Sequence, residues 1–325
     1  KAGFQRMRPG RKPLVKLWNR RTEHWKRKRN RGNIDMGIGC SKHYIIMTNR
    51  PKDPGLKVTS YIRKYLEDRG ATCTVCADNE SEEQIRLKEG GGDLRSDCMI
   101  VLGGDGTMLK AARETAGNGI PLLGVNLGTV GYLAEVEPIA LDLALEKLLR
   151  EEYTIEDRMM LSGRVLREDG SGEAAQVHAL NDVAITRKGP LQVIQFRIWV
   201  NGQVLNSYGA DGIVIATPTG STGYNMSAGG PIVEPGASLI VLTPICPHTL
   251  NIRSIVLRAE DEVVVEIGEK QSGQDQEVEV NFDGSSCLLL KTGDRIKVTR
   301  SSKTTSIMRL SELSFLERLH RKMSE

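Results

Sequence analysis

A glycine-rich loop with an aspartate at its centre carries the sharpest chemical signal in the sequence. It reads Gly103-Gly104-Asp105-Gly106-Thr107 and follows an apolar run that ends at Leu102. Glycines let the backbone approach phosphate groups closely, and a helix that begins after the loop offers them free N–H groups and positive potential. An aspartate inside such a loop repels phosphate, which indicates a base that accepts a proton from a hydroxyl attacking a phosphoryl group. The alternative interpretation is an ordinary Asp-Gly turn.

A second signal is a run of small and hydroxyl residues from Asp211 to Pro231. It reads Asp211-Gly-Ile-Val-Ile-Ala-Thr-Pro-Thr-Gly-Ser-Thr-Gly-Tyr-Asn-Met-Ser-Ala-Gly-Gly-Pro231. Such a run supplies backbone and hydroxyl hydrogen bonds to a polar ligand, and Tyr224 is placed to stack on a base or enclose it. Ordering so many Gly, Ser and Thr residues costs conformational entropy, which favours a ligand-binding segment over a surface loop.

A third signal is the pair Asn181-Asp182, directly before a predicted strand. Alone, the pair is typical of a turn. Beside the other two signals it supplies an amide that can read an adenine edge and a carboxylate that can hold ribose hydroxyls.

Other patterns narrow the chemistry by their absence from the sequence. There is no GxxxxGK[ST] loop and no GxGxxG fingerprint, which disfavours P-loop NTPases and ordinary dehydrogenases. His248 has no His or Cys partner at metal-ligand spacing, so we expect packing or a capping hydrogen bond there and predict no protein-held metal site. Cys73 and Cys76 lie on opposite faces of a predicted strand, which favours strand packing over a redox or metal pair.

The elements that position the glycine-rich loop alternate between strands and helices from Tyr44 to Arg150. The expected strands are 44–47, 72–76, 98–102 and 122–125, and the expected helices are 56–69, one through Met108, Leu109 and Ala112, and 139–150. This alternation predicts an α/β domain with a mostly parallel sheet. Ligands of such sheets bind at the carboxyl ends of the strands, where the loop lies.

After about Tyr153 the pattern changes to short Val- and Ile-rich runs with almost no helical spacing, which predicts an all-β domain. The expected strands are 183–186, 193–200, 204–208, 213–216, 239–242, 263–267, 278–282, 288–290 and 296–299. Asn201-Gly202 and Asp283-Gly284 are typical hairpin turns. We expect an extension over 1–40, an α/β phosphate-binding domain over 41–150 and an all-β domain over 151–310. The C-terminal helix, 311–325, is expected to pack back on the α/β domain.

Composition is that of a globular protein with aliphatic cores, since 39% of the 325 residues are apolar and only 4% aromatic. No apolar stretch approaches a membrane span and no signal peptide opens the chain, so we expect no membrane partner. The scattered cysteines are typical of reduced thiols in a cytoplasmic protein. Residues 1–32 hold 13 of the 45 Lys and Arg residues but only one of the 41 acids. We expect this segment to be a solvated, disordered extension, with nucleic-acid binding as the alternative.

Together these segments resemble the NAD kinase family. The resemblance rests on Gly103–Thr107 with Ala111-Ala-Arg113, on Asn181-Asp182, on Asp211–Pro231 and on Pro244-Ile-Cys-Pro-His-Thr-Leu250, in matching order from about Tyr44 to Phe315. Lipid kinases and phosphofructokinases share the glycine-rich pentapeptide, whereas the Asp211–Pro231 run is specific to NAD kinases. The resemblance implies an α/β domain, a β domain that binds the dinucleotide, an active site between them, and a homodimer or homotetramer whose neighbouring subunits complete the site.

The resemblance also implies roles for individual residues. Asp105 corresponds to the catalytic proton acceptor, and the phosphate loop corresponds to Gly103, Gly104, Gly106 and Thr107. The other implied contacts with the dinucleotide or its phosphates are Asp105, Gly106, Lys110, Asn181, Asp182, Asp211, Thr222, Gly223, Tyr224, Asn225, Met226, Ser227 and Ser285. The sequence departs from the family at Gly223, where alanine is usual, at Ser285, where glutamine is common, and at Gln192 and Gly209, which replace side chains that can touch ligand in relatives.

The implied reaction moves the γ-phosphate of ATP to the 2′-hydroxyl of the adenosine ribose of NAD, with a divalent ion such as Mg²⁺ carried by ATP. NADH as acceptor and polyphosphate as donor stay open as alternatives. A lipid or sugar kinase of the same fold group is a rival, and it would need an apolar acyl groove or an arginine cluster. A non-catalytic NAD(P)-binding sensor is another rival, and it would not need Asp105.

Overall fold

The computed structural model describes residues 42–81, 83–85, 96–128, 131–170, 176–189, 193–249, 251–269, 273 and 275–324. Ser41–Glu325 forms one compact unit. The basic segment 1–32, Cys40, Gln192 and Leu250 lie outside the described residues. No helix of the described part is long and apolar enough to cross a membrane.

Four parallel strands build the first half of the unit, in the order β2-β1-β3-β4. They are β1 (His43–Thr48), β2 (Thr72–Ala77), β3 (Cys98–Gly103) and β4 (Leu122–Asn126), and the helices are α2 (Lys57–Glu67), α4 (Asp105–Glu114) and α5 (Leu141–Leu149), with the short 3-10 turns η1 (Pro54–Leu56) and η2 (Pro138–Ala140). Every residue of β3 is buried, as expected for a parallel strand covered on both faces. The predicted α/β pattern is therefore confirmed.

Apolar side chains cover both faces of this parallel sheet. Side chains alternate between faces along a strand, so Met47 packs in the layer that includes α4 while Ile46 packs in the layer that includes α2 and α5. In β2, Cys76 belongs to the first layer and Cys73 to the second, which confirms strand packing for this pair. Burial raises the pKa of Cys73 to about 11, so its thiol stays protonated at neutral pH.

Antiparallel strands dominate the second half. They are β5 (Thr154–Leu166), β6 (Val177–Ala179), β7 (Asp182–Arg187), β8 (Ile194–Val200), β9 (Gln203–Ala210), β10 (Gly212–Ala216), β11 (Leu239–Ile245), β12 (Ile255–Arg258), β13 (Val263–Ile267), β14 (Glu277–Phe282), β15 (Ser286–Lys291) and β16 (Arg295–Arg309). Six of them form one sheet in the order β12-β11-β10-β7-β14-β15. Both residues of each predicted hairpin turn, Asn201-Gly202 and Asp283-Gly284, have positive φ, as hairpin turns of this kind require.

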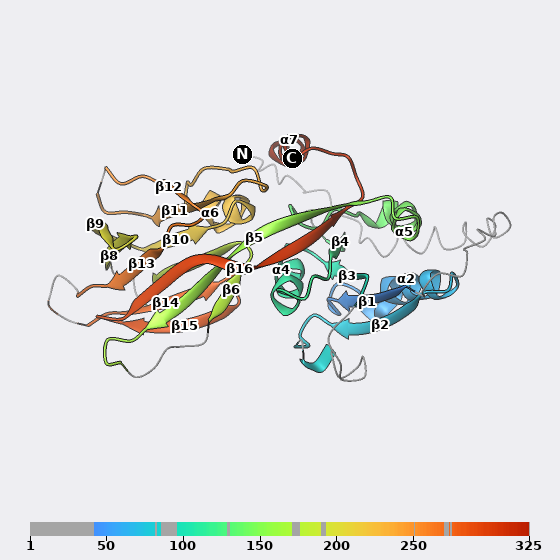
Figure 1. Cartoon of the computed structure of the whole chain (residues 1–325), viewed down its shortest axis with the longest axis horizontal. Helices are drawn as coiled ribbons and strands as arrows, with labels where there is room; N and C mark the ends of the chain where they lie inside the picture. Colours follow the sequence, from blue (N-terminus) through green and yellow to red (C-terminus); the bar gives the residue numbers. More distant parts are fainter. Residues whose placement is uncertain are drawn as a thin grey trace, which may run out of the picture. The chain divides into compact units, whose positions relative to one another are not determined.

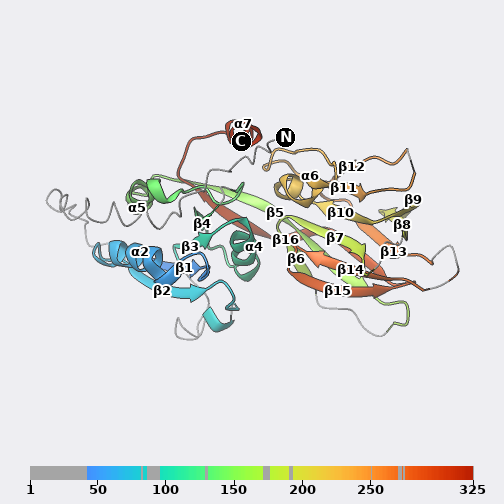
Figure 2. The ribbon, with the colours of Figure 1, turned by 180° about the vertical axis from the view of Figure 1, so that it is seen from behind.

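A long ribbon of β5 and β16 joins the two halves (Figures 1 and 2). Strand β16 pairs with β13 at its start and meets β4 in parallel at Ile307 and Leu122, so the parallel sheet continues into a ten-stranded sheet. The sequence analysis predicted only 296–299 of β16 and did not predict β5. Polar residues such as Glu156, Arg158 and Arg309 interrupt the apolar alternation that marks a strand.

Two short helices lie where the sequence analysis expected none. The 3-10 turn η3 (Thr219–Thr222) and helix α6 (Tyr224–Ser227) fold the small-residue run into two short helical turns. The C-terminal helix α7 spans Phe315–Met323, within the expected range 311–325, and it begins with a capping box between Ser314 and Glu317. None of its residues is buried.

Candidate active site

The glycine-rich loop joins β3 to α4 at the carboxyl end of the parallel sheet. Gly104 is the extended N-cap of α4, and its carbonyl accepts a hydrogen bond of 3.0 Å from the Thr107 amide. A Cβ on Gly103 would lie 2.2 Å from the Thr107 hydroxyl oxygen, so only glycine fits there. The N-terminus of α4 therefore lies directly after β3, and the backbone amides of a helix N-terminus stabilise an anion.

The Asp105 carboxylate is held by backbone amides of a distant segment. Its Oδ2 accepts from the Tyr132 amide at 2.8 Å, and its Oδ1 accepts from the amides of Leu133 and Ala134 at 3.1 and 3.4 Å. A Cβ on Gly131 would lie 1.8 Å from Oδ1. A carboxylate has about four acceptor positions, so Oδ2 keeps one position for a further donor. The sequence did not predict this amide cradle, which is the backbone of Tyr132, Leu133 and Ala134 around the Asp105 carboxylate. Gly131 was the one residue in the sequence that indicated a close approach.

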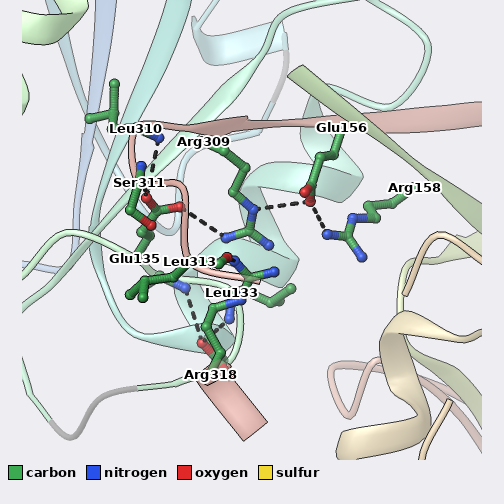
Figure 3. A network of polar contacts seen from close by, with 11 residues as sticks. Leu133, Glu135, Glu156, Arg158, Arg309, Leu310, Ser311, Leu313 and Arg318 are labelled. Carbon is green, nitrogen blue, oxygen red and sulfur yellow. Dashed lines mark hydrogen bonds and ion pairs between the residues drawn. The ribbon is translucent and has the colours of Figure 1, made fainter. Parts of the chain in front are cut away.

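Glu135 joins the segment that holds Asp105 to the end of β16. Its carboxylate accepts from Arg309 Nη1 at 3.3 Å and from the amides of Leu310 and Ser311 at 3.2 and 2.6 Å. Figure 3 shows Glu135 between the Arg309 side chain and the backbone of Leu310 and Ser311. The cradle of Asp105 is thus tied to the end of β16.

A buried cluster of arginines lies behind this fastening (Figure 3). The Arg309 Nε also contacts Glu156 at 3.1 Å, and Glu156 pairs in turn with Arg158. Arg309 and Arg158 are only 4% and 3% exposed. Burial lowers the pKa of Arg158, and burial followed by the charge of Arg309 lowers the pKa of Arg318. These charges carry the desolvation cost of buried ions, which their glutamate partners offset.

Asn181-Asp182 and the small-residue run meet directly. The Thr217 amide donates to the Asn181 carbonyl at 2.8 Å, and the Thr217 hydroxyl donates to the Leu180 carbonyl at 2.6 Å. A Cβ on Gly220 would lie 2.1 Å from the Asn181 carbonyl oxygen, so the close approach requires glycine. The structure therefore brings together the second and third sequence signals.

Asp182 is a buried carboxylate beside a second one. It is 6% exposed, and burial together with the charge of Asp283 raises the pKa of Asp182 to about 7. Asp283 accepts from the amides of Leu180, Asn181 and Asp182 at 2.9, 2.7 and 3.2 Å, but burial still raises its pKa. The Asn181 Oδ1 is buried with no hydrogen-bond partner in the described structure. A buried acceptor without a hydrogen bond lowers the stability of the folded protein unless a donor group of a ligand satisfies it.

The small-residue run divides into residues that hold its shape and residues that face outward. Asn225 is fully buried: its amide donates to the carbonyls of Ser221 and Pro231 and accepts from the Thr243 hydroxyl at 2.6 Å. Tyr224 and Met226 are 42% and 40% exposed. Ser227 is exposed, and Thr222 and Gly223 are half-buried. Asn225 therefore holds the shape of the run, while Tyr224, Met226 and Ser227 are exposed at its surface.

Asp211 and Lys110, two residues that were predicted to contact the ligand, have charged partners within the chain. Asp211 lies 3.9 Å from Arg187 Nε and 4.0 Å from His248 Nε2. The His248 side chain is 54% exposed, so it does not pack in the core, and its backbone amide donates to the Gly209 carbonyl at 3.0 Å. Lys110 Nζ lies 3.8 Å from Asp78 Oδ2.

One contact links the α/β half to the β half at the predicted site. Arg113, near the end of α4, donates to the hydroxyl of Ser285, which follows the Asp283-Gly284 turn. Since Asp283 holds the backbone of Asn181 and Asp182, this contact connects the helix of the glycine-rich loop to the nucleoside pair. In the described ranges no group of three or more His, Cys, Asp or Glu residues is placed to hold a metal ion.

A helix N-terminus with an oriented carboxylate, in one unit with a buried amide oxygen that lacks a partner among the described residues, is typical of a phosphotransferase that acts on a nucleotide. Two family models match the chain: the ATP-NAD kinase N-terminal domain over residues 58–153 and the ATP-NAD kinase C-terminal domain over residues 180–310. The chain belongs to the NAD kinase family.

The chain matches curated relatives over nearly the whole length of those relatives. The NAD kinase of Lachnospira eligens is 44% identical over 87% of this chain and 100% of its own, and that of Lachnoclostridium phytofermentans is 43% identical over 87% and 99%. A solved NAD kinase from Archaeoglobus fulgidus in complex with ATP is similar with a TM-score of 0.69 and 25% identity, over 87% of this chain and 99% of that one.

Yeast NADH kinase complexed with NADH is similar in fold, with a TM-score of 0.76 and 23% identity over 88% of this chain and 89% of that one. These likenesses confirm the predicted fold class and family. None of them supports the rival lipid or sugar kinase.

Proposed function

We propose that this chain transfers the γ-phosphate of ATP to the 2′-hydroxyl of the adenosine ribose of NAD, forming NADP. The observation that carries the proposal is the link between the helix of the Asp105 loop and the Asn181-Asp182 pair through Arg113, Ser285 and Asp283. One ligand that spans this link has its phosphates at α4 and its nucleoside at β7. The family membership and the ATP complex of the archaeal relative support the donor.

Asp105 is the proton acceptor in this proposal. The in-line attack needs the 2′-oxygen aligned with the γ-phosphorus, and the three amides of Tyr132, Leu133 and Ala134 fix the carboxylate that receives its proton. Most of the rate enhancement comes from positioning the reacting groups and from the amides of the phosphate loop.

The nucleoside half of NAD lies against β7 in this proposal. The Asn181 Oδ1, buried and without a partner, accepts a hydrogen bond from the exocyclic amine of adenine. The Asp182 carboxylate accepts from ribose hydroxyls. Thr222, Gly223, Tyr224, Met226 and Ser227 enclose the ligand, with Asp211 beside the nicotinamide half.

The divalent ion enters with the donor, as metal-bound ATP. When bound, the ion offsets the charge of the phosphates. The chain's own contribution is to bind and orient the reacting groups.

A coupled assay tests the proposal: purified protein, NAD, ATP and Mg²⁺, with NADP read by an NADP-specific dehydrogenase. NADP formation that depends on all three additions supports it, and no NADP formation with folded protein overturns it. Parallel reactions with NADH and with polyphosphate identify the acceptor and the donor. Reactions with a diacylglycerol or a sugar phosphate test the rival kinases.

Assembly and location complete the proposal. We expect a homodimer or homotetramer, to be measured by light scattering coupled to size-exclusion chromatography. We also place the protein in the cytoplasm, on the support of the free cysteines Cys73, Cys76 and Cys98, of which the last two are buried.

A further inference from the structure

Lys52 lies over the glycine-rich loop, although no motif singled it out. Its Nζ is 3.1 Å from the position that a Cβ on Gly104 would occupy, and 3.7 Å from the corresponding position on Gly128. These two glycines follow β3 and β4, so the ammonium group lies where the ends of two neighbouring strands meet. This is the place where an open α/β sheet binds phosphate groups.

The backbone under Lys52 is held from both sides. The Lys52 amide donates to the Asn49 carbonyl at 2.9 Å, and the Asn49 Nδ2 contacts the Thr107 hydroxyl at 3.5 Å. On the other side Asp53, only 2% exposed, accepts from the amides of Val58 and Thr59 at 3.0 and 2.9 Å. A tight turn thus fixes the base of the lysine relative to the loop, which lowers the entropy cost of placing its charge there.

The two lysines near the loop differ in their charge partners. Lys110 Nζ lies 3.8 Å from the Asp78 carboxylate, which Asn49 Nδ2 also holds at 2.7 Å. No carboxylate of the described residues lies within 4.0 Å of Lys52 Nζ. The charge of Lys110 is therefore already offset by the protein, whereas that of Lys52 is available to a ligand.

We propose that Lys52 contacts a phosphate group bound at the glycine-rich loop, and that this lysine, more than Lys110, supplies the side-chain charge that holds it. The inference rests on the proposed kinase function. The phosphate belongs to the triphosphate of ATP or to the pyrophosphate of NAD, and the kinetic constants for the two substrates distinguish these sources.

The experiment compares Lys52→Met, Lys52→Arg, Lys110→Met and the control Lys64→Met, which removes an exposed charge from α2. We expect Lys52→Met to lower kcat/KM about 10- to 100-fold, the usual worth of a charged hydrogen bond. Lys52→Arg keeps most of the activity, Lys110→Met loses less than Lys52→Met, and Lys64→Met matches the wild type. A rise in KM for ATP assigns the phosphate to the donor, and a rise for NAD assigns it to the acceptor.

Calorimetric titration with a non-hydrolysable ATP analogue and with NAD gives a second readout, independent of turnover. If Lys52→Met matches Lys64→Met in both kinetics and affinity, the inference is overturned. If the wild type makes no NADP but Lys52→Met still weakens binding of either nucleotide about 10-fold or more, the proposed function fails while the Lys52 contact stands. Melting temperatures equal to that of the wild type confirm that the variants are folded.

Discussion

The Asp105 carboxylate lies 2.8 Å from the backbone nitrogen of Tyr132, 27 residues further along the chain. This hydrogen bond joins the glycine-rich loop after β3 to the segment after β4. The segment is fastened in turn by Glu135 to the end of β16. The orientation of the proposed base therefore depends on contacts from three parts of the chain that are distant in sequence.

Replacing Asp105 by asparagine tests its role as proton acceptor. The amide keeps the size of the side chain but accepts no proton, so we expect kcat to fall by roughly two to four decades, the usual worth of general base catalysis. NAD affinity, measured by calorimetry, should change much less. Near-normal turnover in Asp105→Asn would remove this residue from the mechanism.

Gly131→Ala tests the cradle around the carboxylate. The new Cβ would lie 1.8 Å from Asp105 Oδ1, so the segment or the carboxylate must move. We expect kcat to fall by about 10-fold or more, because a shift of about 1 Å in a reacting group has such a cost. The control is a double-mutant cycle with Asp105→Ala. If Gly131→Ala is as harmful without the carboxylate as with it, the glycine acts on the fold rather than on Asp105.

Arg309→Met tests the buried ion cluster. The change leaves Glu135, which is 9% exposed, without its charged partner, and we expect a loss of about 3–5 kcal/mol in the free energy of unfolding. The matched control is Arg63→Met, which breaks the exposed pair with Glu67 and should change stability by less than about 1 kcal/mol. Urea unfolding curves measure both. Equal losses in the two variants would show that the cluster contributes no more than a surface pair.

Asp182→Asn tests the buried carboxylate pair through the pH dependence of stability. The pKa of Asp182 is raised from 3.8 to about 7, so between these values the native state holds a proton that the unfolded state has released. Stability must therefore fall as pH rises from about 4 to about 7. Asparagine does not titrate and removes this slope, so the variant should gain on the wild type as pH rises. Equal pH slopes in thermal melts of the two proteins would contradict the shift.

The strands and helices around the glycine-rich loop were predictable because they are short, apolar and separated by clear turn residues. Strand β3 and the start of α4 are good examples: a fully apolar run leads into the loop and then into a helix. Strands β5 and the second part of β16 were not predictable, because polar residues such as Glu156, Arg158 and Arg309 interrupt the apolar alternation of both strands.

For the site, residue types were predictable but their partners were not. The sequence indicated Asp105, Asn181 and Asp182, whose chemistry is evident from their side chains. It did not indicate that backbone amides hold Asp105, because amides leave no mark in a sequence. It did not indicate Lys52 either, since a lone lysine in a turn looks like any solvated charge until its distance to Gly104 is known.

The kinetics of NAD test the nucleoside pair, and Asp182 is the residue that decides the outcome. Its carboxylate faces Asp283, and the charge of Arg113 acts on Asp283 from α4. If the ionised form accepts hydrogen bonds from the ribose, KM for NAD should fall several-fold as pH rises from about 6 to about 8, since the group titrates near 7. Asp182→Asn should abolish that pH dependence.

Asp182→Ala should raise KM for NAD and lower kcat together, by about 2–4 kcal/mol in transition-state terms, because the attacking oxygen is also misplaced. The KM for ATP should change less, and an effect confined to ATP, or none on NAD, would make the pair a strand-entry turn with the ribose bound elsewhere.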